Sequence, residues 1–128
     1  DQVGPGSAAG MRLLHAAKIF HQDLFSIWPF QCAAASKSVV VEIFPRFFFK
    51  RTSVSVRRGC FTDDTNLALS SLYSDKLQPG FEVRSEDERE SIVSAAALRR
   101  FCSGDGFWQP ARMTETVRNH EGWIFGVE

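Results

Sequence analysis

One carboxylate stands inside an otherwise apolar stretch of the chain. Glu42 lies within Ser38-Val39-Val40-Val41-Glu42-Ile43-Phe44, which has the β-branched character of a buried strand. A buried carboxylate is costly unless it is paired, protonated or bound to a metal. Pro45 ends this predicted strand, so Glu42 lies near the carboxyl end, where open α/β sheets place their ligands. Glu42 is therefore a candidate catalytic and metal-ligating acid; the alternative is a carboxylate at a solvated rim or paired with Arg46.

A second set of acids opens a helix. Ser85-Glu86-Asp87-Glu88 is a capping box, which predicts a helix from about Glu86 to Phe101. At 100° per residue, Asp87 and Glu90 lie about 60° apart on this helix. They border the face expected to pack on the sheet, which carries Ser94, Ala97, Leu98 and Phe101. Asp87 and Glu90 are further candidate site acids, although acids near a helix start also stabilise the helix dipole without any other role.

Basic and aromatic side chains could serve a phosphate-bearing substrate. The candidates for phosphate contact follow Glu42 and are Arg46, Lys50 and Arg51, with Arg57 and Arg58 beyond them. Arginine can hold phosphate through two parallel hydrogen bonds. The aromatic candidates for stacking on bases are Trp28, Phe30 and Trp123. The alternatives are a solvated basic stretch and ordinary aromatic packing.

The predicted elements that carry these candidate residues alternate between helices and strands. The pattern predicts a helix capped by Ser7 and running through Ile19, a strand over 25–28 ended by Pro29, and an interior strand over 39–43. A short helix or an irregular crossing follows over 46–58. A helix capped by Asp63 or Asp64 should stop near Pro79-Gly80, and the later elements are a helical turn over 113–118 and a closing strand or tail over 121–125. The fold class is α/β.

Composition bounds the chain to a single core. The 128 residues are 44% hydrophobic, and the 15 Lys and Arg balance the 15 Asp and Glu, so there is no global attraction to nucleic acid. No apolar run reaches the length of a membrane helix, which predicts a soluble protein without a membrane partner. The three cysteines lack close spacing and are expected to be reduced thiols, as in the cytoplasm; they are Cys32, Cys60 and Cys102. The three histidines are too scattered to suggest ligands; they are His15, His21 and His120.

Five short motifs in order carry a resemblance to a known family. They are Gly4-Pro5-Gly6-Ser7 leading to Gly10-Met11-Arg12-Leu13-Leu14, Ile27-Trp28-Pro29-Phe30, Val41-Glu42-Ile43-Phe44-Pro45-Arg46, Ser85-Glu86-Asp87 leading to Val93-Ser94-Ala95, and Glu121-Gly122-Trp123-Ile124. In order and spacing the chain resembles the domain of unknown function 429 family. The resemblance implies a ribonuclease H-like fold akin to the RuvC-type junction resolvases. Residues 1–128 would form the C-terminal part of one such domain, without its first strands.

The resemblance also implies a site. In that superfamily, acids of the first strand, a central strand and a C-terminal helix hold divalent metals for phosphodiester hydrolysis. Glu42 matches the central-strand acid, and Asp87 and Glu90 match the helix acids, although aspartate is usual where Glu90 stands. The implied cofactor is Mg²⁺ or Mn²⁺, which prefers oxygen ligands. The first-strand acid is not in this chain, so we expect the chain alone to bind metal weakly and not to hydrolyse nucleic acid.

Three functional classes remain open from the sequence. A metal-dependent nuclease requires clustered acids and cation binding. A nucleotide- or nucleic-acid-binding module without catalysis requires phosphate affinity alone, and a structural or interaction domain requires neither. The sequence does not fix the oligomeric state.

Overall fold

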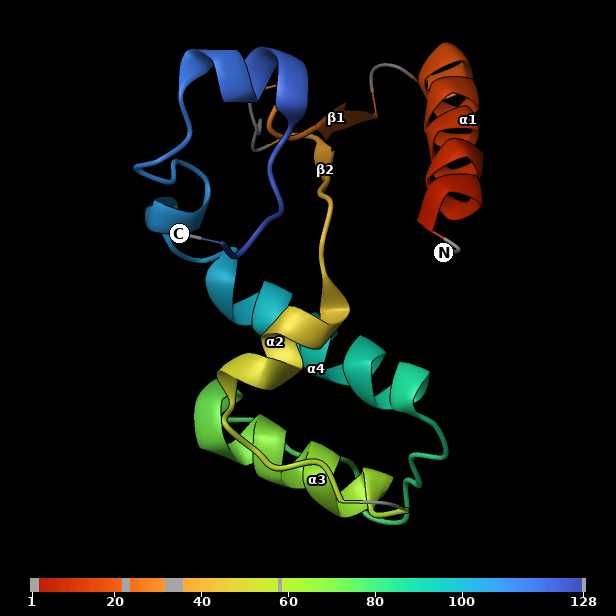
Figure 1. Ribbon diagram of the computed structural model, residues 1–128, viewed down its shortest axis with the longest axis vertical. Helices are drawn as coiled ribbons and strands as arrows, with labels where there is room; N and C mark the ends of the chain where they lie inside the picture. Colours follow the sequence, from red (N-terminus) through yellow and green to blue (C-terminus); the bar gives the residue numbers. More distant parts are fainter. Residues whose placement is uncertain (1–2, 22–23, 32–35, 58, 128) are drawn as a thin grey trace.

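Helices dominate the structure, and two short strands lie between the first two of them (Figure 1). The computed structural model describes residues 3–21, 24–31, 36–57 and 59–127. The elements in chain order are α1 (Val3–His21), β1 (Phe25–Ile27), β2 (Ser38–Val40), α2 (Pro45–Arg51), α3 (Phe61–Ala68), the π-helical turn η1 (Leu69–Tyr73), α4 (Glu86–Phe101), the 3-10 turn η2 (Asp105–Phe107) and the π-helical turn η3 (Val117–Glu121). None of the described helices is long and apolar enough to span a membrane.

The two strands form a small parallel sheet. β1 pairs with β2 in the register Phe25 with Ser38 to Ile27 with Val40, which confirms the predicted strand before Pro29. The prediction of an interior strand over 39–43 is wrong for the described residues, because β1 is the only ladder neighbour of β2 there and the residues of β2 are exposed or half-buried. Beyond β2, pairing continues only as an isolated parallel bridge between Glu42 and Ile124. This bridge is what the structure retains of the predicted closing strand.

Helix α4 has the bounds that its capping box predicts. The Ser85 hydroxyl accepts a hydrogen bond from the Glu88 amide at 3.1 Å. The Glu88 carboxylate reaches back one residue further than expected and accepts from the Arg84 amide at 2.7 Å. Both bonds satisfy amides that a helix start leaves without partners, so the local sequence determines where α4 begins.

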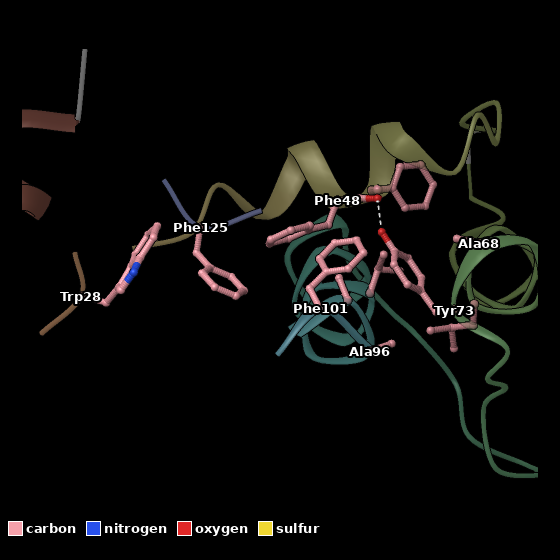
Figure 2. Packing of buried hydrophobic residues seen from close by; sticks show 11 residues of the cluster. Trp28, Phe48, Ala68, Tyr73, Ala96, Phe101 and Phe125 are labelled. Carbon is pink, nitrogen blue, oxygen red and sulfur yellow. Dashed lines mark hydrogen bonds between the residues drawn. The ribbon is translucent and has the colours of Figure 1, made fainter. Parts of the chain in front are cut away.

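The buried face of α4 packs mainly on other helices. Ser94, Ala97 and Phe101 are buried as predicted, but the main partners of α4 are α2 and then α3 with η1, so the prediction of packing across the sheet is wrong. The small side chains let α2 approach closely, and Phe48 of α2 fills the space beside Phe101 with ring centroids 5.9 Å apart. Figure 2 shows these rings in one cluster, where the Tyr73 hydroxyl donates to the Phe48 carbonyl.

Two helices begin before the residues predicted to cap them. α1 begins four residues before Ser7, so that cap is wrong. Pro5 is tolerated in the first turn, where its missing N–H would have no helical partner. α3 begins ahead of Asp63 and Asp64, which lie in its first turn and are not its caps.

The remaining helical predictions are confirmed in part. Within 46–58 the structure has a short helix, α2, whose first residue is Pro45. The helix predicted to reach Pro79-Gly80 ends earlier, because Ser74 adopts a left-handed conformation after η1. The turn predicted over 113–118 lies further along, at η3. The ribonuclease H-like class stays a prediction, since the described residues are mainly helical with one two-stranded parallel sheet.

Candidate functional site

Glu42 is held by its backbone, while its side chain is exposed. Its carbonyl accepts a hydrogen bond from the Phe125 amide at 2.8 Å, within the bridge to Ile124. The carboxylate is solvated, which agrees with the alternative of a solvated rim. Glu42 is therefore in a fixed backbone position from which its carboxylate reaches solvent, just ahead of α2.

Glu90 is the acid of the predicted set that is partly withdrawn from water. It is half-buried on α4, whereas Asp87 is exposed. Burial raises the pKa of Glu90 above its usual range, and the charges of Glu86 and then Asp87 raise it further. Arg46 of α2 and then Arg89 oppose this shift of the Glu90 pKa. Glu90 therefore lies in the field of one base from α2, the main packing partner of α4, and of one base from α4 itself.

The three basic candidates on α2 have different surroundings. Arg46 and Lys50 are exposed and one helical turn apart, so they can act on the same ligand. Arg51 is instead half-buried, and its guanidinium donates to the Gly126 carbonyl at 2.9 Å. The same guanidinium lies over the rings of Phe47, Phe101 and Phe107. Arg51 is therefore committed to holding the C-terminal segment.

The acids are of the right chemical type for a hard cation. Carboxylate oxygens of Glu42, Asp87 and Glu90 are the ligands that Mg²⁺ and Mn²⁺ prefer. Among the residues that the structure describes, however, no group of three or more His, Cys, Asp or Glu side chains is placed to hold a metal ion. The convergence of Glu42 with Asp87 stays a prediction.

Arg89 is a buried cation that the sequence analysis missed. Its side chain is 1% exposed and its guanidinium lies 4.4 Å above the Phe49 ring and 5.7 Å from that of Phe61. Nη2 donates to Glu86 at 3.1 Å, but Nε and Nη1 have no partner among the described residues. The available signal was spacing, since Arg89 precedes Val93 by one helical turn and so shares its buried face.

Asp64 is a buried anion with partners. It is fully buried and accepts from the Arg57 backbone amide and from Arg57 Nε, each at 2.8 Å. The hydrogen bond to Asp64 raises the pKa of Arg57, and the charge attraction adds to it. This pair ties the segment after α2 to α3, so the structure gives Arg57 a structural role. Arg58 lies outside the described residues.

Two of the three candidate stacking aromatics are used inside the fold. Trp28 is buried in edge-to-face contact with Trp108 and Phe125, and it donates to the Trp108 carbonyl at 3.2 Å. The Trp123 indole donates to the Val127 carbonyl at 2.9 Å. Figure 2 shows Trp28 and Phe125 together at one end of the core. Phe30 is exposed and retains the possibility of stacking on a base.

Comparison of the chain with protein-family models, with curated proteins and with solved structures finds no match in any of the three.

Proposed function

We propose that the chain contributes to a metal-dependent site for phosphodiester hydrolysis of the ribonuclease H-like kind. The observation that carries the proposal is the half-buried Glu90. Burial raises its pKa, and the charge of Arg46 on α2 opposes this shift. Acids whose pKa is raised by burial occur at functional sites, where they can be tuned for binding or catalysis. The resemblance to the domain of unknown function 429 family adds Glu42 and Asp87 to the same set.

The acids would hold Mg²⁺ or Mn²⁺, and the bases would hold the substrate. Glu42, Asp87 and Glu90 would be the ligands. An ion held there would supply activation of water and stabilisation of the leaving oxygen. Arg46 and Lys50, both exposed and one turn apart on α2, would hold a substrate phosphate. Cys60 and Cys102 form no disulfide among the described residues, which suits a cytoplasmic location, whereas Cys32 lies outside the described residues.

Metal titration with matched acid variants tests this proposal. Calorimetry with Mn²⁺ should show weak binding by the chain, reduced in Glu42→Gln and in Glu90→Gln because each loses a charged oxygen ligand. Glu115→Gln is the control, since Glu115 is exposed and stands apart from the set. Equal binding by all variants, or no binding by any, contradicts the site.

Nuclease assays with Mg²⁺ or Mn²⁺ address catalysis. Single-stranded, duplex and branched DNA and RNA–DNA hybrids are the substrates, and we expect the chain alone to leave them intact because the proposed site has at most three carboxylate ligands, Glu42, Asp87 and Glu90. Cleavage that Glu42→Gln abolishes would show that these three acids suffice, and cleavage that survives in Glu42→Gln would contradict the role of Glu42.

A structural or interaction role is the second candidate, and a separate observation favours it. Large apolar side chains of α1 are strongly exposed, among them Leu13 and Phe20. Leu13 and Phe20 share one face of α1, and exposed apolar residues that gather on one face mark sites of association.

A further inference from the structure

Helix α1 presents an apolar stripe to solvent. Ala9, Leu13, Ala16 and Phe20 follow each other at spacings of four, three and four residues, which is the spacing of a coiled-coil seam. All four are exposed, Leu13 at 71% and Phe20 at 77%. We call these four residues the outward seam. The half-buried residues of α1 are Leu14, Ala17 and Lys18; Ala17 borders the outward seam, and Leu14 and Lys18 lie further round the helix.

No described part of the chain covers this stripe. α1 is attached at its end, where Lys18 Nζ donates to the Phe25 carbonyl and to Gln31 Oε1. From position 9 to 21 it contributes no residue to the hydrophobic core, and Figure 1 shows it at one side, apart from α2, α3 and α4. Most of the stability of a helix in a protein comes from the packing of its apolar face. A partner that covers the outward seam would stabilise α1.

Charge indicates which partner this is. From position 9 to 21, α1 carries Arg12 and Lys18 and no acid. Two copies of α1 packed through the outward seam would therefore bring Arg12 of each copy to the interface with no acid of positions 9–21 to balance it, which weakens such a pair. The asymmetry extends over the chain: residues 1–58 have eight Lys and Arg against three Asp and Glu, and residues 59–128 have seven against twelve. A complementary acidic surface thus lies on the second half of another copy.

An acidic, partly apolar surface is present at the start of α4. A shallow groove there is lined by Gly80, Phe81, Glu82, Arg84 and Glu88. Phe81 is 51% exposed and also lines the adjoining apolar groove formed with Leu77 and Ile92. Exposed Glu86 and Asp87 add negative charge beside the first groove. We call Gly80 to Glu88 the acidic shelf.

We propose that the outward seam of one copy docks on the acidic shelf of a second copy. Phe20 and Leu13 would pack near Phe81, and Arg12, which flanks the seam, would face the acids. Two such contacts related by a two-fold axis give a closed dimer. The formal net charge of zero removes overall repulsion between copies. This inference is independent of the metal site.

Sedimentation equilibrium of the 128-residue chain tests the seam. Phe20→Glu and Leu13→Glu should each weaken the dimer by about tenfold or more, because each places a charge where an apolar contact forms. Met11→Glu is the matched control, since Met11 is equally exposed at 66% but lies on the opposite side of α1. Circular dichroism checks that helix content is kept. A chain that is monomeric at all concentrations, or equal weakening by Met11→Glu, overturns the proposal.

Charge exchange tests the shelf. Arg12→Glu and Glu82→Arg should each weaken the dimer, and the double variant should recover most of the loss because the attraction is restored with its signs exchanged. The wild-type dimer should also weaken in 1 M salt, where the Debye length falls to about 3 Å. If Phe20→Glu weakens the dimer but neither Arg12→Glu nor Glu82→Arg does, α1 packs on α1 of the second copy. That result rejects the acidic shelf as the contact. Glu90→Gln should leave the dimer unchanged, so failure of the metal site and failure of the dimer are distinguishable.

Discussion

Replacing Arg89 with methionine should stabilise the chain. Methionine matches the length of the arginine stem and fills the same space between Phe49 and Phe61. The replacement also removes a charge from a position that is 1% exposed, together with two N–H groups, Nε and Nη1, that have no partner among the described residues.

The magnitude follows from what Arg89 gains and loses on burial. A desolvated cation–π contact contributes about 2 kcal/mol. The hydrogen bond to Glu86 contributes about 1.5 kcal/mol, the low end for a charged group, because Glu86 is half exposed. Against these stand about 1–3 kcal/mol for each unpartnered N–H and several kcal/mol for desolvating the charge. We expect Arg89→Met to raise the free energy of unfolding by about 1–3 kcal/mol, as replacing buried ionic groups often does.

Urea unfolding followed by circular dichroism measures this change. Glu86→Ala provides the control, since it removes the carboxylate that accepts the hydrogen bond from Arg89 Nη2. In the wild-type background it should destabilise the chain by about 1–2 kcal/mol, and in Arg89→Met only by the helix-dipole part of about 0.5 kcal/mol. Destabilisation by more than about 1 kcal/mol in Arg89→Met would refute the reasoning, because it would mean that Nε and Nη1 are satisfied.

The other predictions concern single contacts of the same helices. Ser85→Ala should cost about 1 kcal/mol of unfolding free energy because the Glu88 amide loses its cap, while Ser91→Ala, at an exposed mid-helix position, should not destabilise; thermal melts compare them. Tyr73→Phe should cost about 1–2 kcal/mol in urea unfolding, because the buried Phe48 carbonyl loses a donor at 2.8 Å. Glu90→Gln should be more stable than wild type at neutral pH. The raised pKa means that ionising Glu90 opposes folding, so the difference should appear as pH rises through the folded-state pKa and vanish in acid; melts from pH 3 to 8 decide it.

The parts of the fold that were predicted correctly are those that short stretches of sequence determine. The α4 bounds follow from the Ser85 capping box, and the buried positions of α4 follow from helical spacing, neither of which depends on distant residues. The strand at β1 was predicted for the same reason, since Pro29 stops it locally. These features were predictable because neighbouring residues alone impose them.

The partners of each element were not predictable in this way. The β-branched run after Ser38 reads as an interior strand, yet Val40 is its last ladder residue and the C-terminal bridge meets only Glu42. Likewise the face of α4 was identified, but small residues such as Ala97 fit a helix as well as a sheet, and α2 occupies that face. Strand pairing and helix packing join residues far apart in sequence, so hydrophobic pattern shows that a face is buried without showing what buries it.

The partners of the charged residues at the start of α4 were not predictable from the sequence either, and these residues connect two of the predictions. Arg89 and Glu90 are consecutive on α4 and meet one turn of α2, where Phe49 lies under the guanidinium and Arg46 acts on the carboxylate. An apolar pair at these positions would pack with less desolvation cost. If Arg89→Met and Glu90→Gln both raise the free energy of unfolding, the native residues at two adjacent positions of α4 are less stabilising than their replacements. Such a loss of stability is typical of a functional site. If Glu90→Gln has no effect at any pH, then Glu90 is solvated, and the observation that supports the metal site fails while the packing of α4 on α2 remains.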